Sequence, residues 1–192
     1  MKKISFSIFV FFSIILFCSL GTWQIYRLQW KLDLINEINY GLNSESVPYS
    51  KTNIINYQKV KFSGTFDFGK QIYLYSLNSN GKPGYDIITP LKINSNEILI
   101  VNRGWISNDL KNNKNINKMK SKSFEGIVKK ISKPNPFKPE NDIKNNVWYS
   151  LKLEDLQNFT GYKLTNFVLY LQNSQNNLVE KKIISPDLPN NH

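Results

Sequence analysis

The chain has 192 residues, a formal net charge of +11, one cysteine, two methionines and a single histidine. That length allows one domain with an appendage. The sulfur-bearing residues are too few for an internal disulfide framework, a cysteine-based zinc site or a thioether copper site. With only His192 and Cys18 available, Ser-His-Asp and Cys-His catalytic sets are not expected. The composition therefore favours a protein that is not an enzyme.

Residues 4–26 carry no charged side chain and predict a transmembrane helix. As a helix they would extend about 34 Å, enough to cross a bilayer. A cleavable signal peptide ending near Ser19 and Gly21 is the alternative. The length of the apolar run and the helical pattern that follows it favour a retained anchor. Lys2 and Lys3 before the run favour an N-terminus inside the cytoplasm, which would place the rest of the chain outside it.

Residues 27–42 predict an extension of this helix at the membrane interface. Trp23, Arg27, Trp30 and Leu34 recur at helical spacing and share one face. Tryptophan suits the interface because its ring has one apolar and one polar edge, and arginine suits the headgroup region just beyond. Gly41 is expected to cap the end of the helix.

Residues 55–185 predict a β-rich domain. Strand patterns occupy residues 57–66, 71–77, 85–93, 98–106, 124–132, 164–173 and 178–185, and Asn80-Gly81 predicts a hairpin turn. Residues 108–123 are polar, lysine-rich and expected to be mobile, whereas residues 150–161 predict a short helix ended by Gly161. About seven strands and two helices imply a mainly antiparallel α+β domain with a partly closed, barrel-like sheet.

Two motifs go beyond generic patterning. The first is LGTWQIYRLQWKLDLI, with Gly21, Trp23, Gln24, Arg27, Trp30 and Lys31 at its key positions; the second is ILIVNRGWI, with Asn102, Arg103, Gly104 and Trp105. Together with GYDIITPL, FKPENDIKNNVWYSLKLEDL and PDLPNNH, in this order, they resemble the Surfeit locus protein 1 family of cytochrome c oxidase assembly factors. That family continues past a Pro-Asn-Asn-His-like segment into a second transmembrane helix, so residues 186–192 are expected to be the start of a missing or absent second segment.

The resemblance implies a role with haem a. It implies that His192 is a ligand of the haem iron, since neutral imidazole is a common axial ligand. Arg27 could pair with a haem propionate, and Trp23 and Trp30 could stack on the porphyrin. Lipid anchoring explains these three residues equally well. Arg103 is expected to form a salt bridge within the fold rather than contact a ligand, Gly104 to permit a bulge or close approach, and Trp105 to belong to the core.

The leading interpretation is a chaperone-like factor of the respiratory chain in a bacterial inner membrane, with its β-rich domain in the periplasm; a mitochondrial membrane is less favoured. Its expected partners are the oxidase large subunit, membrane lipids and, as a haem source, haem a synthase. One alternative is a cofactor-free scaffold that docks an oxidase subunit. Another is an exported barrel-like module that binds nucleic acid or lipid headgroups. The positive net charge is compatible with binding to either of these anionic partners. The anchor argues against nucleic acid, and the spread of the lysines is also consistent with solvated loops.

Overall fold

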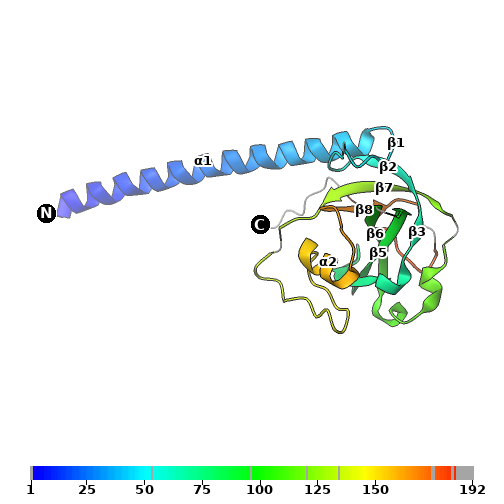
Figure 1. Cartoon of the computed structure of the whole chain (residues 1–192). Coiled ribbons are helices and arrows are strands. Elements are labelled where there is room, and N and C mark those ends of the chain that lie inside the picture. Colours follow the sequence, from blue (N-terminus) through cyan, green and yellow to red (C-terminus); the bar gives the residue numbers. More distant parts are fainter. Residues whose placement is uncertain are drawn as a thin grey trace. The chain divides into compact units, whose positions relative to one another are not determined.

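The computed structural model describes residues 2–52, 54–95, 97–119, 121–133, 135–173, 176–182 and 184, with the backbone alone at residues 2, 3 and 5. The chain forms two compact units, of which one contains the N-terminal residues up to Tyr40 and the other spans Gly41–Ser185. The first unit is built on helix α1, Lys2–Asn43 (Figure 1). Its segment Phe6–Asn43 contains an 18-residue window of mean hydropathy 2.1, long and apolar enough to cross a membrane. The predicted long apolar helix is thus confirmed.

Gly41 does not cap α1, contrary to the prediction, because the helix continues to Asn43. A Cβ atom at position 41 would lie 2.5 Å from the backbone oxygen of Tyr57. Tyr57 itself has a positive φ of 62°. Glycine is therefore needed here for a close backbone approach inside the last turn of the helix.

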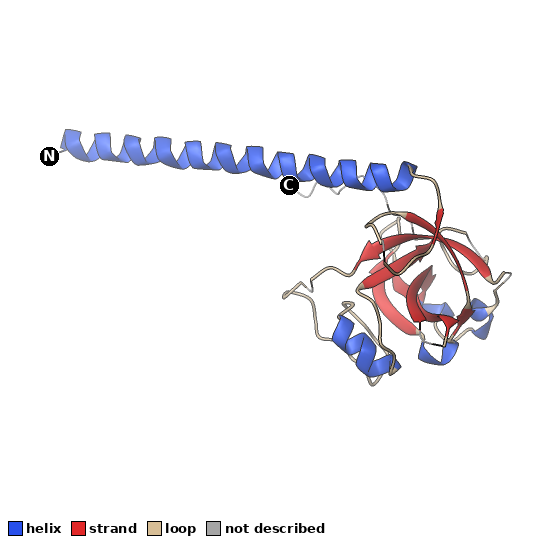
Figure 2. Ribbon diagram, turned by 45° about the horizontal axis from the view of Figure 1, so that its top comes forward, coloured by secondary structure: helices blue, strands red, loops and turns tan. Residues whose placement is uncertain are grey.

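The second unit is an eight-stranded sheet that curls around its own interior (Figure 2). Its strands follow the order β1-β2-β7-β8-β6-β5-β3, with β4 also paired to β5. They are β1 Val47–Pro48, β2 Lys59–Ser63, β3 Thr65–Phe66, β4 Ile72–Leu77, β5 Pro83–Asn94, β6 Glu97–Ser107, β7 Ser123–Lys130 and β8 Phe167–Leu171. β1 with β2 and β6 with β8 run parallel, and the other pairs are antiparallel.

The curl follows from a bend in the first predicted strand. Gly64 divides it into β2, which pairs with β7, and β3, which pairs with β5. A Cβ at Gly64 would lie 2.4 Å from the backbone oxygen of Lys92, so only glycine allows this crossing. Of the two halves of this extended segment, β3 thereby lies at one end of the strand order and β2 lies next to β1 at the other end. This arrangement confirms the prediction of a mainly antiparallel, partly closed sheet.

The hairpins of the centre of the sheet are those predicted. β4 and β5 pair across a turn at Gly81, whose φ is +74°, and β5 and β6 pair across the turn that follows Asn94. Pro90 lies inside β5, where its carbonyl accepts a hydrogen bond from the backbone N–H of Asp67 at 2.8 Å. Pro90 lies between Leu91, which pairs with Phe66 of β3, and Ile88, which pairs with Ile72 of β4. The missing N–H therefore falls in a gap of the ladder.

Two predicted segments differ from the structure. Residues 178–185 do not form a strand in the described part, because Glu180 alone bridges to Trp105. Residues 108–123 contain the 3-10 helices η2, Asn108–Leu110, and η3, Lys114–Asn117, and Ile116 in η3 is buried. The buried side chain of Ile116 and a hydrogen bond from the Tyr73 hydroxyl to the backbone oxygen of Lys111 hold this polar segment on the domain. A further 3-10 helix, η1, spans Phe68–Lys70.

Both faces of β6 are buried, which explains its nearly continuous apolar sequence. One face lines the interior of the curl, where Leu99 and Val101 pack against the aromatic rings of Phe62 and Phe124. The other face carries Ile98 and Ile100 and packs with residues of helix α2, Leu153–Thr160. Gly161 ends α2 in the left-handed conformation, with φ +71°, as predicted. Consecutive residues of β6 therefore point into different buried environments.

Candidate functional site

The motif Asn102–Trp105 lies at the end of β6, inside the domain. Arg103 follows Leu99 and Val101 on the face that lines the interior. Its Nη1 donates hydrogen bonds to Gln71 Oε1 at 2.8 Å and to Asn117 Oδ1 at 3.2 Å. Its Nη2 donates to the backbone oxygen of Ile116. The guanidinium thus joins the start of β4 to the 3-10 helix η3.

The electrostatic setting of Arg103 differs from the prediction. No carboxylate pairs with it in the part of the chain that the structure describes, so the expected salt bridge is not found there. The guanidinium instead faces the rings of Phe66 and Phe68, at 5.5 and 5.0 Å from their centroids. Burial lowers the pKa of Arg103 to about 10, and the side chain therefore stays charged at neutral pH. Neutral amides and aromatic faces therefore stabilise the charge of Arg103.

Asn102 points to the opposite face and belongs to a second polar group. Its amide donates to Asp86 Oδ2 at 3.2 Å, and its Oδ1 accepts from the backbone N–H of Gly104 at 2.9 Å. Lys182 Nζ lies 3.3 Å from Asp86 Oδ1. Burial raises the pKa of Asp86, while Lys182 and Asn102 act in the other direction. Burial and the charge of Asp86 raise the pKa of Tyr170 to about 12.

Gly104 and Trp105 hold the chain segment around Glu180. Gly104 has a φ of +125°, and a Cβ there would lie 2.3 Å from the backbone oxygen of Glu180. The prediction that Gly104 permits a close approach is confirmed. Trp105 is 4% exposed, and its backbone exchanges two hydrogen bonds with Glu180, of 2.7 and 2.8 Å. The motif Asn102–Trp105 is consequently occupied by contacts within the domain.

The first motif lies on α1 and is exposed within its unit. Trp23 and Trp30 are 52% and 64% exposed, and the guanidinium carbon of Arg27 lies 5.4 Å from the ring centroid of Trp23. Gln24 is exposed and Lys31 is half-buried. An arginine over a tryptophan ring forms a flat cationic surface that suits an anionic, aromatic or headgroup-like partner.

His192 lies outside the described residues. Within the described residues, no group of three or more histidine, cysteine, aspartate or glutamate side chains is arranged to hold a metal ion. Cys18, on α1, is exposed within its unit. The predicted convergence of His192 with Arg27, Trp23 and Trp30 therefore stays a prediction.

Comparison with known proteins decides the family. The SURF1 family model matches residues 11–192, which include both motifs. The chain belongs to the SURF1 family. A SURF1-like protein of Rickettsia prowazekii is 38% identical over 179 residues, covering 87% of this chain and 69% of its own length. That of Rickettsia conorii is 34% identical, covering 87% and 70%. Surfeit locus protein 1 of Gallus gallus is 33% identical, covering 76% of this chain and 54% of its own length.

Within this SURF1 family domain, the sequence indicated the motif but not its partners. Asp86 stands among apolar residues in GYDIITPL, and a carboxylate in a buried strand is a signal that it has a partner. Gln71 and Lys182 carry no such signal. Both are distant in sequence from the residues that they contact, and only the folded sheet brings Gln71 to Arg103 and Lys182 to Asp86.

Proposed function

We propose that this chain is a membrane-anchored assembly factor for a haem-copper cytochrome c oxidase, and that it carries haem a as a cargo toward the large subunit. The SURF1 family is known in general as a family of oxidase assembly factors. The match of the family model to residues 11–192 is the observation that carries the proposal. The apolar helix α1 supports the membrane location, and the Rickettsia relatives support a bacterial membrane. The placement of the sheet domain in the periplasm is proposed from Lys2 and Lys3, which precede the apolar run.

The residues of this chain have the chemistry that a haem cargo needs. His192 is the single imidazole and the natural axial ligand for the iron. Arg27 can form paired hydrogen bonds with a propionate, and its position over Trp23 leaves the edge of the guanidinium for that contact. Trp23 and Trp30 offer aromatic faces to the macrocycle. Haem binding here requires His192 and the Arg27 face of α1 to meet around one porphyrin.

In the proposed role the protein does not convert its cargo chemically; the bond that it makes is the reversible coordination of the haem iron by His192. Its residues bind and orient the cargo, and release follows when the oxidase subunit offers its own ligands. Haem a synthase is the proposed donor and the oxidase large subunit the acceptor. Gln24 and Lys31 flank Arg27 on the helix and are proposed to hold the same face in contact with headgroups or propionates.

The test is the absorbance spectrum of the full chain purified in mild detergent from cells that make haem a. We expect a haem a band in the wild type, its loss in His192→Ala, and its recovery when imidazole is added to that variant. Lys61→Ala, on the exposed side of β2, is the matched control and should keep the band. A band that survives His192→Ala would show that His192 is not the ligand.

The cofactor-free scaffold is the second candidate. It is favoured by the finding that the residues of Asn102–Trp105 form their hydrogen bonds with other residues of the domain, and not with a ligand. The same purification separates the two. Wild-type protein that retains the oxidase large subunit in stoichiometric amount but carries no porphyrin would favour the scaffold and exclude the haem carrier.

A further inference from the structure

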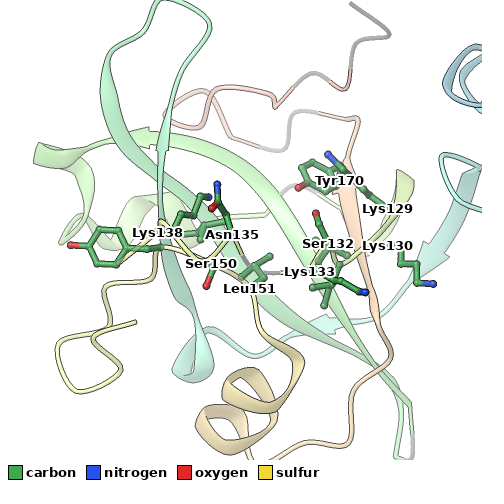
Figure 3. Close-up of a pocket in the computed structure, with 13 residues that line it drawn as sticks. Lys129, Lys130, Ser132, Lys133, Asn135, Lys138, Ser150, Leu151 and Tyr170 are labelled. Carbon is green, nitrogen blue, oxygen red and sulfur yellow. The ribbon is translucent and has the colours of Figure 1, made fainter. Parts of the chain in front are cut away.

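A basic pocket lies on the sheet domain, and Arg103 and the residues that it hydrogen-bonds are not among its described lining residues. It has a volume of about 300 Å³ and opens between the end of β7 and residues 149–151 (Figure 3). Four lysines line it: Lys129, Lys130, Lys133 and Lys138. No aspartate or glutamate is among the described lining residues. So concentrated a positive charge in a concave site attracts anions.

Lys129 is the innermost of these charges. Its side chain is half-buried, and its Nζ lies 5.7 Å from the ring centroid of Tyr170. No carboxylate pairs with Lys129 in the described part of the chain. Burial and, secondarily, the charge of Lys182 lower its pKa. A half-buried cation without a counterion is costly, so an anion that enters the pocket gains more from Lys129 than from a solvated surface lysine.

The remainder of the wall has a mixed character. Figure 3 shows Leu151 near the middle of the pocket, with Ser150 and Lys138 on one side and Ser132 and Lys133 on the other. The serine hydroxyls can donate hydrogen bonds to an oxyanion. Leu74, Leu151 and Val168 add apolar surface. The combination fits a phosphate ester that carries an apolar substituent better than it fits a bare inorganic ion.

We propose that this pocket binds the phosphate of an anionic phospholipid headgroup, with Lys129, Lys133 and Lys138 around the phosphate and the Leu151 side against the glycerol ester region. Lysine is a common phosphate ligand because it acts as a mobile point charge. The lipid is favoured over a soluble phosphate ester because α1 is long and apolar enough to tether the domain to a membrane, which keeps headgroups at high effective concentration. The site is independent of the haem proposal.

The test measures binding of soluble short-chain lipids to the full chain in an uncharged detergent, by native mass spectrometry. Vesicle binding would not serve, since α1 would hold the protein on any bilayer. The probes are dihexanoyl phosphatidylglycerol, dihexanoyl phosphatidylcholine, glycerol 3-phosphate and inorganic phosphate. For the wild type we expect one phosphatidylglycerol bound, at least about tenfold more tightly than phosphatidylcholine or either soluble phosphate.

Two triple variants of equal charge change separate the pocket from general electrostatics. Lys129→Gln/Lys133→Gln/Lys138→Gln should weaken phosphatidylglycerol binding about tenfold or more. Lys61→Gln/Lys82→Gln/Lys144→Gln, at exposed sites outside the pocket, should change it less than about twofold. Equal loss in both would overturn the proposal, as would a wild type without preference for phosphatidylglycerol. If Lys129→Gln impairs folding, Lys133→Gln/Lys138→Gln on the exposed loop should still weaken binding about threefold or more.

The phosphate probes decide the source of the anion. Glycerol 3-phosphate that binds as tightly as phosphatidylglycerol, and loses affinity in the pocket triple, would show that the ligand is a soluble phosphate ester and overturn the lipid assignment. Loss of haem a in His192→Ala with unchanged phosphatidylglycerol binding is expected, because the two sites share no residue.

Discussion

The guanidinium of Arg103 donates a 2.8 Å hydrogen bond to the side-chain oxygen of Gln71, inside the curled sheet. The same oxygen also accepts from the hydroxyl of Thr89 at 3.1 Å. A neutral amide therefore takes the place that a carboxylate would hold in a buried ion pair. The charge is stabilised by several dipoles and two aromatic faces instead of one opposite charge.

Removal of the amide should therefore be costly. We expect Gln71→Leu to lower the free energy of unfolding by about 2–4 kcal/mol, because it leaves part of a buried cation unsatisfied. Thr89→Val removes a neutral donor from the same oxygen and keeps the Arg103 contact, so it should cost about 1 kcal/mol. Urea unfolding of the full chain in mild detergent measures both. A Gln71→Leu cost no larger than that of Thr89→Val would contradict the role given to Gln71.

Gly104→Ala is expected to destabilise the domain strongly. The new Cβ would meet the backbone oxygen of Glu180, and the φ of +125° is itself unfavourable for alanine. Gly81→Ala is the matched control, because Gly81 also has a positive φ, of +74°, but has no atom within 4 Å of the added Cβ. We expect about 1 kcal/mol for Gly81→Ala and at least about 3 kcal/mol for Gly104→Ala, measured by urea unfolding. If the two substitutions lowered the free energy of unfolding equally, the backbone near Glu180 would be able to move away from the added Cβ without cost.

The hairpins could be predicted because their signals are local. Asn80-Gly81 supplies the turn before β5, and the apolar run 98–101 is typical of a strand that is buried on both faces. Gly161 likewise ends α2 by its own conformation. The same reasoning gave Gly41 a capping role, and that failed because the backbone oxygen of Tyr57 is the neighbour that requires glycine. The local pattern around Gly41 does not reveal the approach of Tyr57, because the two residues are brought together only in the folded domain.

The partners in the sheet were less accessible from sequence. The parallel pairing of β6 with β8 joins Ile100 to Val168, across more than sixty residues of chain. The pattern of residues 178–185 is that of a strand, but the described residues there contribute one bridge, Trp105 with Glu180. Both outcomes depend on which edge of the sheet is available, which is a property of the whole fold. For the candidate site, the motif residues were identified and the neutral partners of Arg103 were not.

The loss of folding stability at acid pH should depend on Asp67. Its Oδ2 accepts a 2.5 Å hydrogen bond from the hydroxyl of Tyr162 and lies 3.3 Å from Lys92 Nζ. These contacts, the Tyr162 bond first, lower the pKa of Asp67 below its ordinary value of 3.8. A lowered pKa means that the unfolded chain binds a proton first as pH falls. The stabilisation by Asp67 is therefore complete above the unfolded pKa and is lost as pH falls through the folded pKa.

We expect Tyr162→Phe to reduce stability by about 2 kcal/mol at pH 7 and by less as pH falls from about 4 to about 2, where the carboxylate becomes protonated. Urea midpoints of wild type and variant at each pH measure the difference. Taking the difference cancels the contribution of Asp86, whose raised pKa acts with the opposite sign. A Tyr162→Phe cost that stays constant across this range would show that the hydrogen bond does not depend on the Asp67 charge.

The anchor role of α1 predicts a strong dependence on charge in its apolar segment. Phe12 and Ile15 lie within that segment, and each arginine at the centre of a spanning helix costs about 3 kcal/mol of insertion free energy. Phe12→Arg/Ile15→Arg should therefore move the protein from the carbonate-resistant membrane fraction to the extract. Asp33→Arg/Asn36→Arg, on the same helix beyond residues 4–26, should leave it in the membrane. Extraction of both variants to the same extent would mean that the apolar segment is not what holds the chain in the membrane.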